Sequence, residues 1–191
     1  MACEQPSIGA AAFLADQMAA LVPDIRTQRL LLRAPRIDDF DAYAEIACGP
    51  RGVHMGGPMT RAEAWYDFAS MTAGWLLRGH GLWTISLLAS GECLGFVLLG
   101  FEPGDAEPEL GFMLCKSAEG QGFAAEAAEA ARRYGFEELN LPALASYIAQ
   151  DNARSIALAE RLGAISEAPV SQEDGEEKSL IFRHPRPEVQ P

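Results

Sequence analysis

A glycine-rich turn between two predicted regular elements is the sharpest chemical feature of this sequence. It reads Glu119-Gly-Gln-Gly-Phe-Ala124 and lies between an apolar strand-like segment and a helix. Glycines let the backbone approach a ligand closely, and the first turn of a helix presents free N–H groups and the positive end of its dipole. The turn is therefore expected to bind an anion such as phosphate through its main chain. The alternative is a plain tight turn that only leads into a helix packed on a sheet.

The spacing of the glycines separates this turn from two common nucleotide-binding classes. It lacks the Gly-x-x-x-x-Gly-Lys-Ser/Thr pattern, which excludes a P-loop hydrolase. Gly120-x-Gly122-x-x-Ala125 satisfies the loose dinucleotide fingerprint. A Rossmann half, however, needs successive parallel strand–helix repeats, and only one crossover remains before the chain ends. We therefore favour a different phosphate-bearing ligand.

A second motif, Asn152-Ala-Arg-Ser155, begins a helix directly after a predicted strand. Asparagine is a preferred N-cap residue, and taken by itself Asn152 is interpreted as one.

The elements that must position these motifs follow from hydrophobic periodicity and turn signals. Mostly antiparallel strands come first, and one strand–turn–helix–strand–helix unit follows, which predicts a mixed α/β fold with a single crossover. The glycine- and proline-rich segment 49–58 is expected to be a loop, and 102–108 an acidic, turn-rich connection. Strands are predicted at 29–33, 82–89, 92–101, 109–115, 144–150 and 178–183, and helices at 7–21, 38–47, 60–76, 123–139 and 152–162.

The chain divides into a short amphipathic helix at 1–22, a main domain at 23–187 and a tail at 188–191. The apolar side of the N-terminal helix must be buried against this chain or against another copy, so a homodimer is possible.

Composition limits the partners and the compartment. The 191 residues carry 15 basic and 27 acidic side chains, a net charge of −12, which leaves no basic face for nucleic acid and mildly favours cationic substrates. No uncharged stretch approaches the ~20 residues of a membrane span, and the acidic N-terminus does not resemble a signal peptide. Four scattered cysteines and three histidines indicate neither disulfides nor a metal site. We expect a cytoplasmic protein without a membrane partner and without a metal.

Taken together, four segments resemble the GNAT superfamily of acetyl-coenzyme A-dependent N-acyltransferases. The nearest subgroup is related to the ribosomal-protein alanine N-terminal acetyltransferases, and the likeness covers the chain from about Arg26 to Pro187. The segments are Thr27-Gln-Arg-Leu-Leu-Leu-Arg33, Glu109-Leu-Gly-Phe-Met-Leu114, Gly120-Gln-Gly-Phe-Ala-Ala-Glu-Ala127 and Asp151-Asn-Ala-Arg-Ser-Ile-Ala-Leu-Ala-Glu-Arg-Leu-Gly163.

The resemblance implies an α/β fold with a strongly bent, mostly antiparallel sheet of six or seven strands flanked by helices. Coenzyme A would lie in a splay between the strand ending at Cys115 and the strand starting near Leu144. Asn152 would hydrogen-bond the pantetheine arm, and Ser155 would lie near the thioester sulfur. The remaining implied cofactor contacts are main-chain groups of Phe112, Met113 and Leu114 for the pantetheine, and of Glu119, Gly120, Gln121, Gly122, Phe123 and Ala124 for the pyrophosphate.

Two positions depart from the family pattern. Glu119 stands where the family turn usually begins with Gln or Arg, and it adds a negative charge near the phosphates. Ala159 replaces the tyrosine that many members use to protonate the leaving thiolate, so that Ser155 would inherit this role or leave it to water. The competing interpretation of Ser155 is that it only completes the first turn of its helix.

Direct transfer from a thioester to an amine requires a base, because an alkylammonium group has a pKa of about 10. We expect Glu109 to be this base, acting through a water, with Glu107 and His54 as rivals; the alternative is that Glu109 is a solvated surface carboxylate. The N–H group around Met113 would stabilise the oxyanion.

Two functions remain open from the sequence. The first is an acetyltransferase that modifies a primary amine, either a peptide N-terminus or a small molecule. The second is a non-catalytic coenzyme A-binding sensor or interaction domain, because a fold does not fix a function. Acetyl as the transferred group follows from the resemblance alone.

Overall fold

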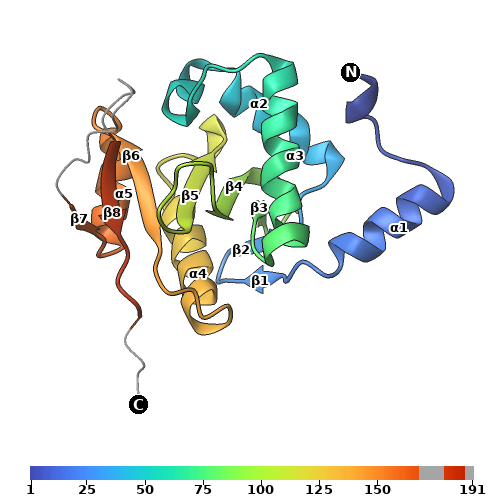
Figure 1. Cartoon of the computed structure of the whole chain (residues 1–191). Helices are drawn as coiled ribbons and strands as arrows, with labels where there is room; N and C mark the ends of the chain where they lie inside the picture. Colours follow the sequence, from blue (N-terminus) through green and yellow to red (C-terminus); the bar gives the residue numbers. More distant parts are fainter. Residues whose placement is uncertain (168–178, 188–191) are drawn as a thin grey trace.

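The computed structural model describes residues 1–167 and 179–187 (Figure 1). Lys178, the predicted start of the last strand, and the predicted tail at 188–191 lie outside these residues. The helices are α1 (Gly9–Ala19), α2 (Phe40–Ala47), α3 (Arg61–Arg78), α4 (Phe123–Glu137) and α5 (Ala153–Arg161). The strands are β1 (Ile25–Arg26), β2 (Leu30–Arg33), β3 (Leu82–Leu87), β4 (Cys93–Gly100), β5 (Glu109–Leu114), β6 (Ala145–Ala149), β7 (Ile165–Ser166) and β8 (Ser179–Arg183).

The strands form one sheet in the order β1-β2-β3-β4-β5-β6-β8-β7, in which only β5 and β6 are parallel neighbours. The predicted mixed α/β fold with a single crossover is confirmed, since α4 connects β5 to β6. The sheet has eight strands rather than six or seven because short strands, β1 and β7, extend its two edges.

Helices cover both faces of the sheet. Phe96 and Leu98 of β4 pack with α2 and α3, whereas the alternating Val97 and Leu99 pack with α4. Successive side chains of a strand point to opposite faces, so the two hydrophobic cores lie on opposite sides of the sheet. The capping box at Thr60 fixes the start of α3: its side chain accepts from the Glu63 N–H, and the Glu63 carboxylate accepts from the Thr60 N–H at 2.7 Å.

The parallel strands β5 and β6 separate almost as soon as they meet. Their only paired residues are Glu109 and Ala145, whereas β6 pairs with β8 along its whole length. One step beyond that pair, Ser146 Oγ donates to the Leu110 carbonyl at 2.6 Å. This side chain stands in for the next hydrogen bond of the ladder at the point where the strands diverge. The splay between central strands is therefore present.

The imidazole of His184 contacts Ser146 where β5 and β6 diverge. Its Nε2 atom lies 2.9 Å from Ser146 Oγ, and both side chains are buried. Burial, together with the nearby charge of Arg132, lowers the pKa of His184 to about 4, so the ring is neutral at physiological pH. The neutral ring can donate its Nε2–H to Ser146 Oγ, and the Ser146 hydroxyl can then donate its own proton to the Leu110 carbonyl.

Two segments differ from the sequence-based expectations. The predicted loop at 49–58 contains a short 3-10 helix, Pro50–Met55. The N-terminal helix forms as α1, but its apolar side chains are exposed, with Phe13 at 67% and Leu14 at 60% of their surface, and Figure 1 shows it projecting from the body of the protein. Of the two expected ways to bury its apolar side, packing against the rest of the described chain is not observed, and packing against another copy stays a prediction. Among the described residues, no helix combines the length and apolarity required to cross a membrane.

Candidate active site

The glycine-rich turn has the backbone conformation that a main-chain anion site requires. Gly120 and Gly122 have φ values of +73° and +79°, in the left-handed region that favours glycine. Helix α4 begins at Phe123, and no described side chain caps its N-terminus. The N–H groups of its first turn are therefore available to a ligand, supported by the positive end of the helix dipole.

Arg29, directly before β2, holds this turn in place. Its Nη1 atom donates to the Gln121 carbonyl at 2.9 Å, and its guanidinium lies 4.5 Å from the centre of the Phe123 ring. Its Nε atom donates to Glu126 of α4 at 2.7 Å. These contacts explain why the resembling segments at 27–33 and 120–127 occur together: one strand braces the turn and the helix that follows it.

Three cations surround Glu119, the residue that departs from the family pattern. Its carboxylate forms ion pairs at 2.9 Å with Arg51 and at 2.9 Å with Arg154, and Lys116 lies 3.9 Å away. The local charge is therefore positive, in contrast to the net negative charge expected from Glu119 alone. Sequence reasoning missed Arg51 and Arg154 as members of this site. Arg154 lies inside the Asn152 motif, and Arg51 lies in the glycine- and proline-rich segment 49–58, but nothing in the sequence indicated that either side chain contacts Glu119.

Two adjoining pockets form one groove through the splay. The smaller, of about 610 Å³, covers the glycine-rich turn, and the larger, of about 870 Å³, extends past β6 to Glu109. Of the predicted cofactor residues, Gln121 and Phe123 contribute no side chain: Gln121 Nε2 donates to the Ser117 carbonyl, and Phe123 is buried. Both pockets are lined by Phe112, Met113 and Ser155, which were predicted, and by Arg51 and Arg154, which were not. Of the other predicted site residues, the smaller pocket contains Leu114, Glu119, Gly120, Gly122 and Ala124. The larger pocket contains Asn152 and Glu109.

The backbone groups of β5 alternate between its neighbour β4 and the open splay. The Cys115 N–H donates to the Leu94 carbonyl of β4, and the Met113 carbonyl points the same way, toward Gly95. The Leu110 carbonyl points to the other side, where it accepts from Ser146. Because N–H and C=O of one strand residue point to the same side, Phe112 and Leu114 present their backbone groups to the groove. The N–H of Met113 belongs to the β4 ladder, so it does not support the expected oxyanion contact.

Asn152 and Ser155 lie at the groove as the first turn of α5. The Asn152 Oδ1 atom accepts from the Ser155 N–H at 3.2 Å, which confirms the N-cap interpretation. Asn152 also lines the larger pocket, and Ser155 lies where the two pockets meet. Ala159, at the position of the family tyrosine, is buried against Ile148 and Phe182 and is absent from the described lining of both pockets.

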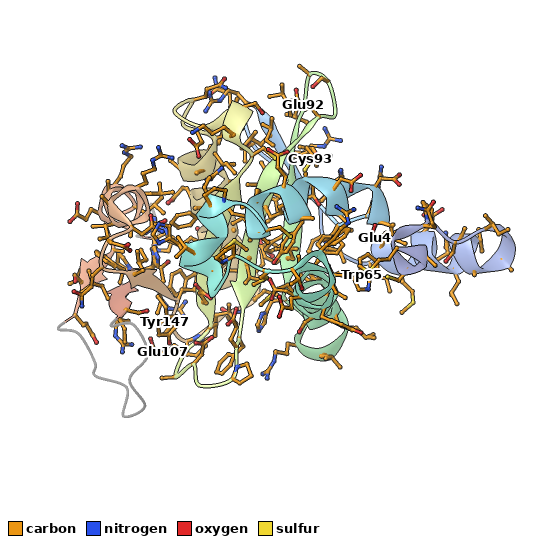
Figure 2. The ribbon with its side chains drawn as sticks, turned by 90° about the horizontal axis from the view of Figure 1, so that it is seen from above. Glu4, Trp65, Glu92, Cys93, Glu107 and Tyr147 are labelled. Atoms are coloured by element: carbon orange, nitrogen blue, oxygen red, sulfur yellow. The ribbon has the colours of Figure 1, made fainter. Side chains whose placement is uncertain are left out.

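The predicted base and its rivals occupy different environments. Burial, followed by the charges of Glu102 and Asp105, raises the pKa of Glu109 to about 8, although a hydrogen bond from the Tyr147 backbone opposes this. Glu107 forms an ion pair with Arg183 and does not occur among the described lining residues of either pocket. Figure 2 shows Glu107 beside Tyr147, at the β6 side of the protein.

His54 lines the larger pocket, and its Nδ1 atom lies 3.5 Å from Asp151. The segments predicted as a loop at 49–58 and as a turn-rich connection at 102–108 both line this pocket. The first supplies the 3-10 helix that carries His54, and the second supplies Glu102 and Asp105.

Comparison with known proteins assigns the family. The family model described as an acetyltransferase (GNAT) domain matches residues 29–165, which is most of the chain. The chain belongs to the GNAT acetyltransferase family. Its domain is accordingly of the acyl-coenzyme A-dependent acetyltransferase class, and the predicted resemblance is confirmed.

Solved GNAT structures share the fold of the whole domain. The acetyltransferase from Agrobacterium tumefaciens str. C58 superimposes with a TM-score of 0.80 at 39% identity, covering 86% of this chain and 95% of that one. A ribosomal L7/L12 alpha-N-protein acetyltransferase, RimL, in complex with coenzyme A has a TM-score of 0.69 at 18% identity, covering 86% and 98% of the two chains, and this likeness concerns the fold alone.

A curated relative, the uncharacterized protein YkkB of Bacillus subtilis (strain 168), is 36% identical over 92 residues, which are 45% of this chain and 52% of that protein. The match thus spans about half the length of YkkB.

The groove of this GNAT domain fits a coenzyme A-based cofactor. The turn offers uncapped N–H groups beside Arg51 and Arg154, which suits a pyrophosphate. The open edge of β5 offers Phe112 and Leu114 to the amide groups of a pantetheine arm, as a neighbouring strand would meet them.

Proposed function

We propose that this chain transfers an acetyl group from acetyl-coenzyme A to a primary amine by direct attack within a ternary complex. The acceptor is a small-molecule amine or a peptide N-terminus. One observation carries the proposal: a continuous groove joins the anion-binding turn at Gly120–Ala124 to the Glu109 carboxylate along the open edge of β5. Such a groove brings a thioester and an amine to the same point with a base beside them.

Acetyl-coenzyme A supplies the activated acetyl group. In this proposal, Gly120 to Ala124 bind its pyrophosphate, Phe112 and Leu114 bind the pantetheine arm, and Asn152 adds a side-chain hydrogen bond. The free Nδ2 group of Asn152 suits this role, because Oδ1 is already used to cap α5.

Glu109 removes a proton from the acceptor ammonium, directly or through a water. A carboxylate with a pKa of about 8 is a far better match to an alkylammonium than an ordinary glutamate, since proton transfer is most efficient between groups of similar pKa. A single N–H group at the open edge of β5, that of Phe112 or that of Leu114, stabilises the developing oxyanion in place of that of Met113.

Ser155 donates a proton to the departing thiolate in this scheme, and water is the alternative donor. Its position where the two pockets meet supports this role, because the reacting thioester must lie there between the turn and Glu109. We also propose that the protein works in the cytoplasm, in line with its four free cysteines.

A coupled assay tests the function. Purified protein is incubated with acetyl-coenzyme A and a panel of amines that includes N-terminal peptides, polyamines, amino acids and aminoglycosides. Release of free thiol and the mass of the product are then measured, together with thermal shifts by acetyl-coenzyme A and NAD. We expect an acetylated amine, and a thermal shift with acetyl-coenzyme A only. Binding without turnover of any amine would favour the non-catalytic alternative.

A further inference from the structure

The end of the larger pocket that lies away from the glycine-rich turn is lined by carboxylates. Asp67 comes from α3, Glu102 and Asp105 come from the connection between β4 and β5, and Glu109 begins β5. They approach one another closely enough to interact: the charge of Asp67 acts on Glu102, and the charges of Glu102 and Asp105 act on Glu109. Three separate segments of the chain therefore place their negative charges in one cavity.

The described residues provide no basic partner for these four carboxylates. Other acids of the protein are paired, such as Glu119 with two arginines and Glu126 with Arg29. Asp67 instead accepts from the Tyr43 hydroxyl at 2.5 Å, and Asp105 accepts from the Glu102 N–H at 2.6 Å. The basic side chains that line the pocket lie elsewhere: Arg51, Lys116 and Arg154 surround Glu119, and His54 faces Asp151.

Partial burial makes this arrangement unfavourable for the protein alone: Asp67, Asp105 and Glu109 are half-buried, whereas Glu102 is exposed at the edge of the cavity. It raises the pKa of Asp67, Glu102, Asp105 and Glu109 above the usual range of carboxyl groups, and mutual repulsion adds to the effect at Glu102 and Glu109. Gathering unpaired carboxylates in a cavity is destabilising unless a cation from outside joins them. More than one carboxylate is available, so a single ammonium group beside Glu109 leaves the others unpaired.

Apolar side chains line the same pocket as these carboxylates. Such a surface suits a methylene chain, whereas a polar or sugar-like acceptor would lose hydrogen bonds against it. The apolar lining residues are Ile46, Met55, Met59, Met71, Leu82 and Leu98.

We propose that the acceptor is an aliphatic diamine or polyamine. The amine that is acetylated lies beside Glu109, the methylene chain lies on the methionine-rich wall, and a second ammonium group lies between Asp67 and Glu102. Asp67 and Glu102 are thus specificity residues, which bind the acceptor without taking part in the proton transfer. This inference rests on the proposed acetyltransferase function and narrows its substrate class.

Three acceptors of equal chain length test the charge of the distal group. The compounds are 1,5-diaminopentane, 1-aminopentane and 5-aminopentanoate, whose distal groups are positive, apolar and negative. We expect kcat/KM to be about ten- to a hundredfold higher for the diamine than for 1-aminopentane, the range expected for hydrogen bonds to a charged group, and lowest for the amino acid. High salt should reduce the difference between the diamine and 1-aminopentane.

Asp67→Asn and Glu102→Gln test the residues. Both substitutions keep the size and the acceptor oxygen of the side chain, so the Tyr43 hydrogen bond can persist. We expect each variant to raise KM for 1,5-diaminopentane much more than KM for 1-aminopentane. Because the charge of Glu102 also raises the pKa of Glu109, Glu102→Gln should in addition shift the pH profile of both amines to lower pH by the same amount. Glu92→Gln is the matched control, because Glu92 is exposed on the β3–β4 hairpin, far from Tyr147 in Figure 2.

The outcomes distinguish this inference from the function on which it rests. Equal kcat/KM for the diamine and 1-aminopentane, a peptide acceptor that surpasses the diamine, or a preference that survives both substitutions would overturn the inference and leave the acetyltransferase intact. If no amine is acetylated although acetyl-coenzyme A binds, the proposed function fails and the inference fails with it.

Discussion

Arg154 donates from Nη1 to the Glu119 carboxylate at 2.9 Å, which ties helix α5 to the turn that precedes α4. Arg51 forms an ion pair with the same carboxylate from the acceptor side of the groove. Glu119 thus holds two guanidinium groups at the edge of the glycine-rich turn. A phosphate that enters the turn can replace Glu119 as their partner, because Arg binds carboxylate and phosphate with the same planar set of donors.

Glu119→Gln should therefore improve cofactor binding. The substitution removes a negative charge near the phosphates and frees Arg51 and Arg154 for them. We expect KM for acetyl-coenzyme A to fall about two- to fivefold at low salt, the size expected for partly exposed ion pairs, and to converge with that of the unmodified protein at high salt. Arg154→Gln should raise KM, whereas Arg133→Gln on the exposed side of α4 should leave it unchanged. A higher KM in Glu119→Gln would show instead that the carboxylate organises the turn.

The rate should depend on pH through Glu109. A base with a pKa of about 8 is active only when it has lost its proton, so kcat/KM should increase with pH and level off above about 8. Glu109→Gln should lower kcat by about 10²- to 10⁴-fold and remove this pH-dependent limb. Glu107→Gln, outside the groove, should retain both the rate and the limb. A profile unchanged by Glu109→Gln would assign the base to another group, with His54 next to be tested.

Stability should respond to the same group in the opposite direction. The pKa of Glu109 is raised in the folded protein from 4.5 to about 8, so between these values the folded state binds more protons than the unfolded state. The free energy of unfolding therefore decreases as pH rises through this window. Glu109→Gln should make the melting temperature less dependent on pH from about 5 to 8. An equally steep decline in the variant would contradict the raised pKa.

Gly120→Ala and Gly163→Ala form a matched pair. Both glycines have left-handed φ values, +73° and +77°, and neither new Cβ would meet an atom within 4 Å. Each substitution should destabilise the protein by about 1–2 kcal/mol, measured by denaturant unfolding. Only Gly120 lines the cofactor pocket, so only Gly120→Ala should also weaken acetyl-coenzyme A binding in calorimetry. Equal affinities in the two variants would argue against the turn as the pyrophosphate site.

The exposed apolar residues of α1 should mediate self-association. We expect Phe13 and Leu14 to pack against a second copy, on which Leu76 and Leu77 of α3 are also exposed. Light scattering should give a dimer for the unmodified chain and a monomer for the Phe13→Ser, Leu14→Ser double variant, which retains the contact of Glu4 with Arg61. If light scattering gives the same mass for both proteins, α1 does not mediate self-association.

The parts of the fold that sequence predicted are those that local chemistry determines. Thr60 and Glu63 cap the helix that follows them wherever that helix lies, and the alternating apolar residues of β5 specify a strand. The glycines of the turn require a left-handed backbone that their neighbours cannot change. The strands β1 and β7 were not predicted, because two residues are too few to show an alternating pattern of apolar and polar side chains.

The parts of the site that sequence did not predict depend on contacts between distant segments. Arg51 reaches Glu119 because the 3-10 helix Pro50–Met55 brings it to the lining of both pockets. The direction of the Met113 N–H depends on the register of β5 with β4, in which Met113 pairs with Phe96. The apolar residues of α1 are exposed because the helix does not pack on the described body of the protein, and residues 7–21 by themselves do not determine this.

The single paired step between β5 and β6 has a mechanical consequence. The sheet consists of two half-sheets, one formed by β1 to β5 and the other by β6, β8 and β7. They are joined by the pair Glu109–Ala145 and by the hydrogen bond from Ser146 to the Leu110 carbonyl. A cofactor that occupies the splay takes the place of the hydrogen bonds that β5 and β6 do not form with each other, so it should hold the two half-sheets at a fixed separation. Deuterium exchange at the amides of Phe112 and Leu114 should therefore become slower when the groove is occupied. Exchange at Met113, which pairs with Phe96 of β4, should instead report only whether the half-sheet of β1 to β5 is intact.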